Sequence, residues 1–117
     1  MNQQECMEVG INYEEGVSRF VGNAQLYEKF LREFLRDTTF AELSAAMQKG
    51  DVEAAFRAGH TLKGRTGNLS LTALYAHLVA LVDALRGEGN LALARTLFPP
   101  VAEDYRRAVE FITARLG

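Results

Sequence analysis

The stretch Ser70-Leu-Thr-Ala-Leu-Tyr-Ala-His-Leu-Val-Ala-Leu-Val-Asp-Ala-Leu85 carries the clearest structural pattern in the sequence. Its large apolar side chains recur every three or four positions, as they do in an α-helix with one buried face. These side chains are Leu71, Leu74, Tyr75, Leu78, Leu81, Val82 and Leu85. No segment of the chain alternates with the period of two that indicates a strand. The sequence therefore predicts an all-α fold, with Ser70 as the N-cap of this helix.

Two more helices are predicted upstream, on either side of Gly50-Asp51. Asp51 can cap a helix that begins at Val52 and ends near Gly67-Asn68. The apolar spacing before Gly50 predicts one long helix, which Asn23 caps and which ends at about Lys49. Because Gly50 and Asp51 leave almost no loop, the two helices must fold back antiparallel.

The two ends of the chain carry weaker signals. The first ten residues show no clear period, but Asn12 with Glu15 resembles a capping box and predicts a short leader helix through about Phe20. Residues 91–116 have a helical pattern that contains Pro99-Pro100. Proline removes a backbone donor and clashes with the preceding turn, so we expect a kink or break there, with Pro100 starting a second helical piece.

Together these segments predict an antiparallel up-and-down four-helix bundle with a short N-terminal leader helix. At 117 residues the chain has the size of one domain. A single domain over residues 1–117 is expected, with its bundle core at about residues 23–116. Hydrophobic residues make up 48% of the chain and charged residues 24%, which is the balance of a globular protein and not of a disordered one.

Charge and cysteine content exclude several classes of protein. The net charge of −2 provides no basic field for a nucleic acid. Cys6 is the only cysteine, which excludes an intramolecular disulfide and a cysteine-rich zinc site. No apolar stretch approaches the roughly 18–20 residues of a membrane span, and the N-terminus lacks the pattern of a signal peptide. We therefore expect a cytoplasmic, monomeric protein that binds neither nucleic acid nor membrane.

The segment from Gly59 to Asn68 is unusual for a helix because it contains three glycines. Each glycine in a helix interior costs about 1 kcal/mol relative to alanine. Gly64 and Gly67 follow His60 by four and seven positions, which places them on the same face of the helix. Helical side chains lean toward the N-terminus, so a side chain at position 64 would lie over His60. Glycine leaves the imidazole uncovered.

His60 itself points about 100° away from the centre of the apolar stripe, on the side of Glu53 and Arg57, and is expected to face solvent. Lys63 follows one turn later and can bring an ammonium group near anything attached to the imidazole. Since imidazole is largely neutral at pH 7, a ring nitrogen can act as a nucleophile without a special base.

The run His60-Thr-Leu-Lys63-Gly64-x-x-Gly67-Asn68, preceded by the Gly50-Asp51 turn and followed by a leucine-spaced helix, closely resembles histidine-phosphotransfer (HPt) domains. The resemblance covers residues 11 to 116. It implies that His60 accepts a phosphoryl group from an aspartate of a response-regulator receiver domain and relays it to another receiver in a two-component phosphorelay. It further implies that Lys63 supports the phosphoryl charge and that Gly64 makes room for docking.

The same resemblance implies a phosphoryl carrier without kinase activity of its own, whose partners are receiver domains, with a hybrid sensor histidine kinase as a further candidate. No cofactor is expected on this chain, since the Mg²⁺ belongs to the receiver. Arg57 and Arg65 are candidates for steering an acidic receiver site, and with Gly64 and Gly67 they complete the expected docking surface.

Three positions depart from the usual pattern of the family. They are Gly59, where alanine is usual, Ser70, where glycine is common, and Val82, where many members carry a polar residue that approaches the histidine. His77, the second histidine, is interpreted as a residue at the boundary of the apolar face.

Other functions find less support in the sequence. Neither histidine follows a glutamate by three positions, as a di-iron bundle requires, and no metal site is expected. Nucleotide-binding and hydrolase motifs are missing. The alternative is a docking or adaptor module of the same fold that is not phosphorylated.

Overall fold

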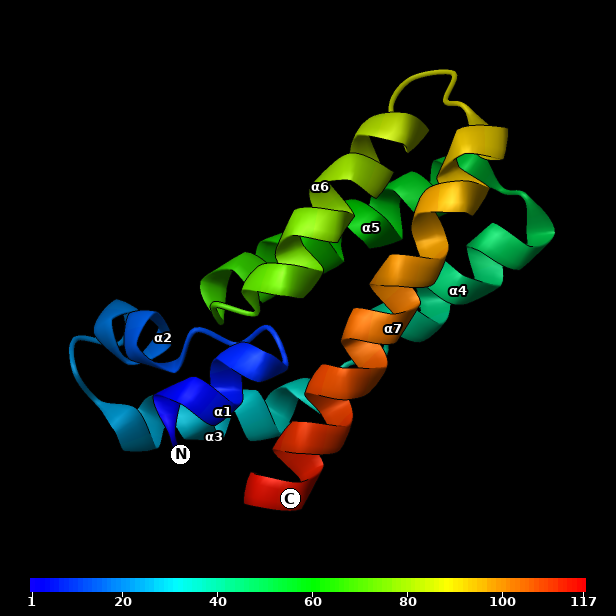
Figure 1. Cartoon of the computed structure of the whole chain (residues 1–117). Coiled ribbons are helices and arrows are strands. Elements are labelled where there is room, and N and C mark those ends of the chain that lie inside the picture. The colour runs from blue at the N-terminus through cyan, green and yellow to red at the C-terminus, as the bar shows by residue number, and fades with distance from the viewer.

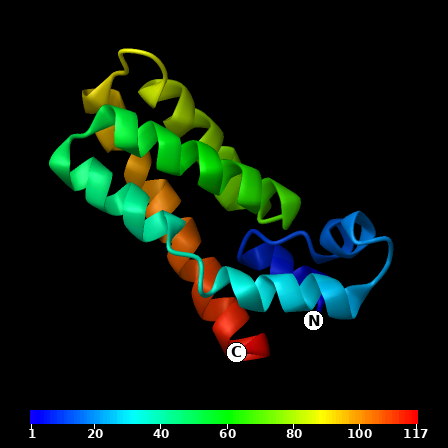
Figure 2. The same ribbon diagram turned by 180° about the vertical axis from the view of Figure 1, so that it is seen from behind.

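The computed structural model describes all 117 residues, which form seven helices and no strand (Figure 1). The helices are α1 (Gln3–Glu8), α2 (Tyr13–Arg19), α3 (Ala24–Phe34), α4 (Thr39–Lys49), α5 (Val52–Asn68), α6 (Thr72–Leu85) and α7 (Leu91–Leu116). α4 packs on α5, α5 on α6 and α6 on α7, each pair antiparallel, while α1, α2 and α3 gather at one end (Figures 1 and 2). The predicted all-α bundle with short N-terminal helices is confirmed.

A single cluster of 20 buried residues forms the core. The apolar rows predicted for α5 and α6 supply much of it. In α5 the buried residues are Ala55, Gly59, Leu62 and Thr66. The predicted row of α6 is buried except for Tyr75, which is 39% exposed. None of the helices combines the length and the apolarity needed to cross a membrane.

The hairpin between α4 and α5 forms as its sequence predicts. Gly50 ends α4 in the left-handed conformation at φ 71°, which glycine adopts without a steric penalty. The Asp51 side chain then accepts a hydrogen bond of 3.0 Å from the backbone N–H of Ala54. These two adjacent residues end one helix and begin the next, so α5 returns directly along α4.

The long helix predicted from Asn23 to Lys49 is wrong, because the chain forms two helices there. α3 ends at Phe34, α4 begins at Thr39, and the chain changes direction between them (Figure 2). Asp37 Oδ1 accepts a 2.7 Å hydrogen bond from the backbone N–H of Thr39, which satisfies a donor of the first turn of α4. A side chain that bonds to the nearby backbone competes with helix continuation, and here it starts a new helix.

The break predicted at Pro99-Pro100 is also wrong, because α7 runs uninterrupted through both prolines. The backbone donors that they lack would have bonded the carbonyls of Arg95 and Thr96. Both of those residues are exposed, so water can reach their carbonyl oxygens. Buried residues on both sides of the prolines, Ala94 and Val101, hold the helix against the core.

Two further features lie near the N-terminal end of the bundle. The first ten residues, whose sequence shows no clear period, contain α1, whose six residues are too few to show one; Cys6 within it is fully buried. Ser70 is not a helix cap. It adopts φ 54°, which is uncommon outside glycine, and its hydroxyl group donates to Glu15 at 2.7 Å and accepts from Arg19 Nε at 3.1 Å. Ser70 therefore fastens α2 to the turn before α6.

Candidate functional site

His60 lies near the middle of α5, and its side chain is exposed. The ring of Phe56, one turn earlier, stacks beside it with ring centroids 5.9 Å apart and an interplanar angle of 18°. This contact supports the imidazole from the N-terminal side of the helix. The exposure predicted for His60 is present in the structure.

The flank of α5 that carries His60 faces α6. Three contacts set the register between the two helices: Tyr75 against Gly67, Val82 against Gly59, and the Arg86 guanidinium 5.4 Å from the centroid of the Phe56 ring. These contacts follow one antiparallel register, so Val82 is the α6 residue beside His60. Because valine cannot hydrogen-bond, α6 offers no polar side chain at this point.

The two glycines that follow His60 have different surroundings. A methyl group added at Gly64 would meet no atom within 4 Å, so the space beyond the imidazole is open, as predicted. A methyl group at Gly67 would lie 3.0 Å from a ring carbon of Tyr75. Gly67 lies on the same face as His60, as expected, and its missing side chain lets the Tyr75 ring pack against α5.

The two cationic side chains nearest to His60 on α5, Lys63 and Arg57, differ in whether they form an ion pair. Lys63, one turn later, is partly buried and makes no ion pair, so its ammonium group is available. Arg57 forms a 2.7 Å ion pair with Glu53 on the exposed surface of the same helix. An exposed pair of this kind contributes little and can open easily. Both side chains can therefore turn toward a group attached to His60.

Arg65 lies on the other flank of α5. Five residues along a helix amount to a rotation of about 140°, which separates Arg65 from His60. Its guanidinium donates to Asp37 Oδ2 at 2.5 Å and to Thr39 Oγ1 at 2.8 Å. Burial alone would raise the pKa of Asp37, but hydrogen bonds from Thr39 and Arg65 outweigh it and lower that pKa. Arg65 thus fastens α5 to the start of α4.

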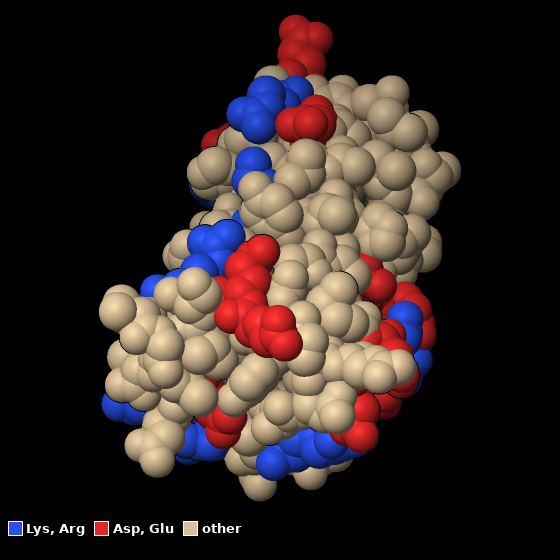
Figure 3. Space-filling view, turned by 60° about the vertical axis from the view of Figure 1, so that its left-hand side comes forward, with Lys and Arg blue, Asp and Glu red and all other residues tan.

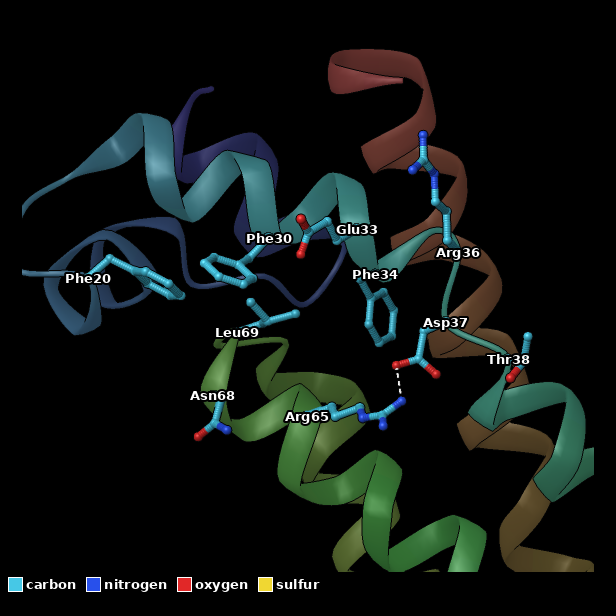
Figure 4. A pocket seen from close by; sticks show the side chains of 10 residues that line it. All are labelled: Phe20, Phe30, Glu33, Phe34, Arg36, Asp37, Thr38, Arg65, Asn68 and Leu69. Atoms are coloured by element: carbon cyan, nitrogen blue, oxygen red, sulfur yellow. Dashed lines mark hydrogen bonds and ion pairs between the residues drawn. The ribbon is translucent and has the colours of Figure 1, made fainter.

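A pocket of about 610 Å³ opens on this second flank (Figure 4). Phe20, Phe30, Phe34 and Leu69 supply its apolar wall, and the ion pair between Asp37 and Arg65 borders it. The pocket lies between α3 and the C-terminal end of α5. It does not include His60.

The second histidine, His77, contacts a carboxylate of the neighbouring helix. His77 Nδ1 on α6 pairs with the carboxylate of Asp104 on α7, with the imidazole half exposed. The structure contains no group of three or more His, Cys, Asp or Glu side chains placed to hold a metal ion.

Comparison with known families agrees with this geometry. The family model described as Hpt domain matches residues 25–111, which include all of α4, α5 and α6 and most of α3 and α7. The chain belongs to the Hpt domain family. No curated protein and no solved structure gave a match. Membership in the Hpt family implies a role in histidine phosphotransfer within a phosphorelay.

Sequence reasoning missed three contacts on the His60 side of α5 in this Hpt domain. Phe56 stacks beside His60, Arg86 lies over the Phe56 ring, and Tyr75 packs on Gly67, two helical turns from His60. Phe56 and Tyr75 fell within apolar rows and were expected to point into the core. An alignment of α5 against α6 in antiparallel register is the signal that could have found Tyr75 and Arg86.

Proposed function

We propose that His60 is the phosphoacceptor of this Hpt domain and that it exchanges its phosphoryl group with receiver domains. The observation that carries the proposal is an exposed imidazole in mid-helix with open space at Gly64 directly beyond it, in a chain of this family. A globular partner can approach a side chain in this position without displacing any other.

In the proposed reaction, the lone pair of a neutral His60 ring nitrogen attacks the phosphorus of a receiver phospho-aspartate. A nitrogen–phosphorus bond forms and the phosphorus–oxygen bond to the aspartate breaks, so the aspartate leaves as a carboxylate. The reverse of the same step passes the group to a second receiver. Catalysis then consists of positioning and of neutralising charge.

Lys63 is the residue of this chain that supports the phosphoryl charge. Its ammonium group lies one turn from His60 and is not engaged in an ion pair. We assign the Mg²⁺ of the transfer to the receiver domain. We further propose that the protein is a monomeric, cytoplasmic carrier with no kinase activity, for which a hybrid sensor histidine kinase that contains a receiver is a suitable donor.

The proposed docking surface surrounds His60 on the exposed side of α5. Gly64 gives access to the imidazole, and Arg57 can steer an acidic partner when its exposed ion pair opens. Gly67 contributes to the surface because its missing side chain lets the Tyr75 ring pack against α5. Arg65 borders the far edge of the surface, where its charge is engaged with Asp37.

The test is transfer from phosphorylated receiver domains to the purified protein. We expect an acid-labile label on the wild type, loss of the label in His60→Gln, and retention in the matched control His77→Gln. An undiminished label in His60→Gln would overturn the assignment. If no receiver labels the wild type, the protein is a docking module of the same fold.

A further inference from the structure

We propose that the groove between Tyr75 and α2 receives a polar loop of the docked receiver domain, with Tyr75 determining which receivers bind well. The proposal rests on the phosphotransfer function given above. It concerns recognition of the partner and assigns Tyr75 no part in the chemical step.

The groove begins one helical turn from His60, at Gly64, and has a volume of about 480 Å³. Its floor is the last part of α5, one wall is Tyr75 and the other is α2. The residues that the argument uses are Arg19, Gly64, Gly67, Asn68, Ser70 and Tyr75.

Both walls of the groove are held in place by the fold. The Tyr75 ring packs so closely on Gly67 that an added methyl group would lie 3.0 Å from it and would press it aside. On the far side, the Ser70 hydroxyl accepts from Arg19 and donates to Glu15, which ties α2 to the turn before α6. The groove is therefore preformed, and a partner need not reorganise it on binding.

The groove also presents polar groups that the fold does not use. The Tyr75 hydroxyl and the Asn68 side-chain amide make no hydrogen bond within the protein, while the hydroxyl groups of Ser70 and Thr72 are both engaged. The wall formed by α6 is almost without charge, since Asp83 is the only charged residue between Thr72 and Leu85. Figure 3 shows a broad uncharged area on this side of the molecule. The two charged residues that line the groove, Glu15 and Arg19, pair with each other at 3.5 Å and both bond to Ser70. The groove therefore suits neutral polar side chains that pack on an aromatic ring.

A receiver that reaches His60 must cover this groove. A standard protein interface buries about 800 Å² on each partner, which corresponds to a disc with a radius of about 16 Å. Gly64 and Gly67 lie only about 6 Å and about 10 Å from His60 along the helix axis. The groove thus falls inside the footprint of a partner centred on the imidazole. Tyrosine is one of the residue types that most often contribute a large share of the binding energy of an interface.

The test measures phosphotransfer as a function of receiver concentration, with the receiver that labels the wild type. Tyr75→Ala is expected to raise the KM for the receiver by about tenfold, and Tyr75→Phe, which keeps the ring on Gly67, by about threefold, with little change in kcat. Leu93→Ala is the matched control, since it shortens an exposed apolar side chain on α7 and should leave KM unchanged.

A second measurement separates recognition from chemistry and from folding. Phosphoramidate is a small donor that transfers its phosphoryl group to imidazole and releases ammonia, so it labels His60 without docking. Tyr75→Ala should be labelled by phosphoramidate at the wild-type rate. Normal transfer with an unchanged KM in both Tyr75 variants would overturn this proposal alone. Failure of every receiver to label the wild type would overturn the proposed function together with it.

Discussion

The two flanks of α5 use their polar groups in opposite ways. On the flank of His60, Gly64 borders open space, Lys63 makes no ion pair and the facing part of α6 presents valine. On the other flank, the Arg65 guanidinium is held by Asp37 and by a threonine hydroxyl. One helix thus carries a flank whose polar groups are free to contact a partner and a flank whose polar groups hold the bundle together. Exposure by itself does not distinguish them, since His60 and Arg65 are both exposed.

The largest effect, on the rate of phosphoryl transfer, is expected from filling the open space at Gly64. In Gly64→Leu the new side chain leans toward His60, so the rate of transfer from a receiver should fall by at least about tenfold while the helical content stays the same. Transfer kinetics together with circular dichroism measure both. A normal rate in Gly64→Leu would show that the space at Gly64 is not used.

The matched change on the other flank is Arg65→Leu, measured in the same assay. A rate within about twofold of the wild type is expected, because the Arg65 guanidinium is already engaged by Asp37 and Thr39. An effect that small corresponds to less than about 0.5 kcal/mol of activation energy. A large decrease would instead place Arg65 in the docking surface.

An intermediate effect, on the free energy of unfolding, is expected from removing the charge of Asp37, which pairs with Arg65. The lowered pKa of Asp37 means that its charged form stabilises the fold above its ordinary pKa of about 3.9. This stabilisation is lost as the pH falls through the lower folded-state pKa. Asp37→Asn should therefore cost about 1 kcal/mol of unfolding free energy at pH 7 and progressively less below about pH 4.

Urea denaturation at several pH values tests this dependence. Glu53→Gln is the control, since it removes an exposed pair with Arg57 and should have almost no effect at any pH. An equal loss of stability in Asp37→Asn at pH 7 and at pH 3 would indicate lost packing and not lost charge.

The smallest effect is expected from alanine at the two glycines. Gly64→Ala meets no atom and should stabilise the protein by about 0.5 kcal/mol, because alanine favours the helix. Gly67→Ala must displace the Tyr75 ring, so it should gain less or lose stability. Thermal unfolding of the two variants measures the difference. Equal stabilisation would mean that Tyr75 is not pressed against α5 in solution.

Much of the helical framework could be predicted because its signals are local. Asn12, Asn23 and Asp51 were each expected to begin a helix, and each accepts a hydrogen bond from the backbone N–H three residues later. The glycine at position 50 ends α4 in the conformation that favours glycine. Such signals depend on residues within one turn of each other, so the sequence shows them directly.

The errors arose where distant residues decide the local structure. Asp37 starts α4 and is in turn held by Arg65, a residue 28 positions away. Ser70 adopts its left-handed conformation with a hydroxyl group engaged by α2. In α7 the packing of residues such as Val101 against the core outweighs the local cost of two prolines. A local sequence pattern cannot show these partners, because they lie far away along the chain.

The sequence alone determined that this protein is an all-helical bundle and that His60 lies on the exposed side of a glycine-rich helix, because helical periodicity is a property of neighbouring residues. The tertiary structure decided which side chains of α6 pack along the same side of that helix. Only the packing of α6 on α5 brings Tyr75 against Gly67 and Arg86 over Phe56. Contacts of this kind depend on the register between two helices, and register is set by the interlocking of side chains across the whole interface.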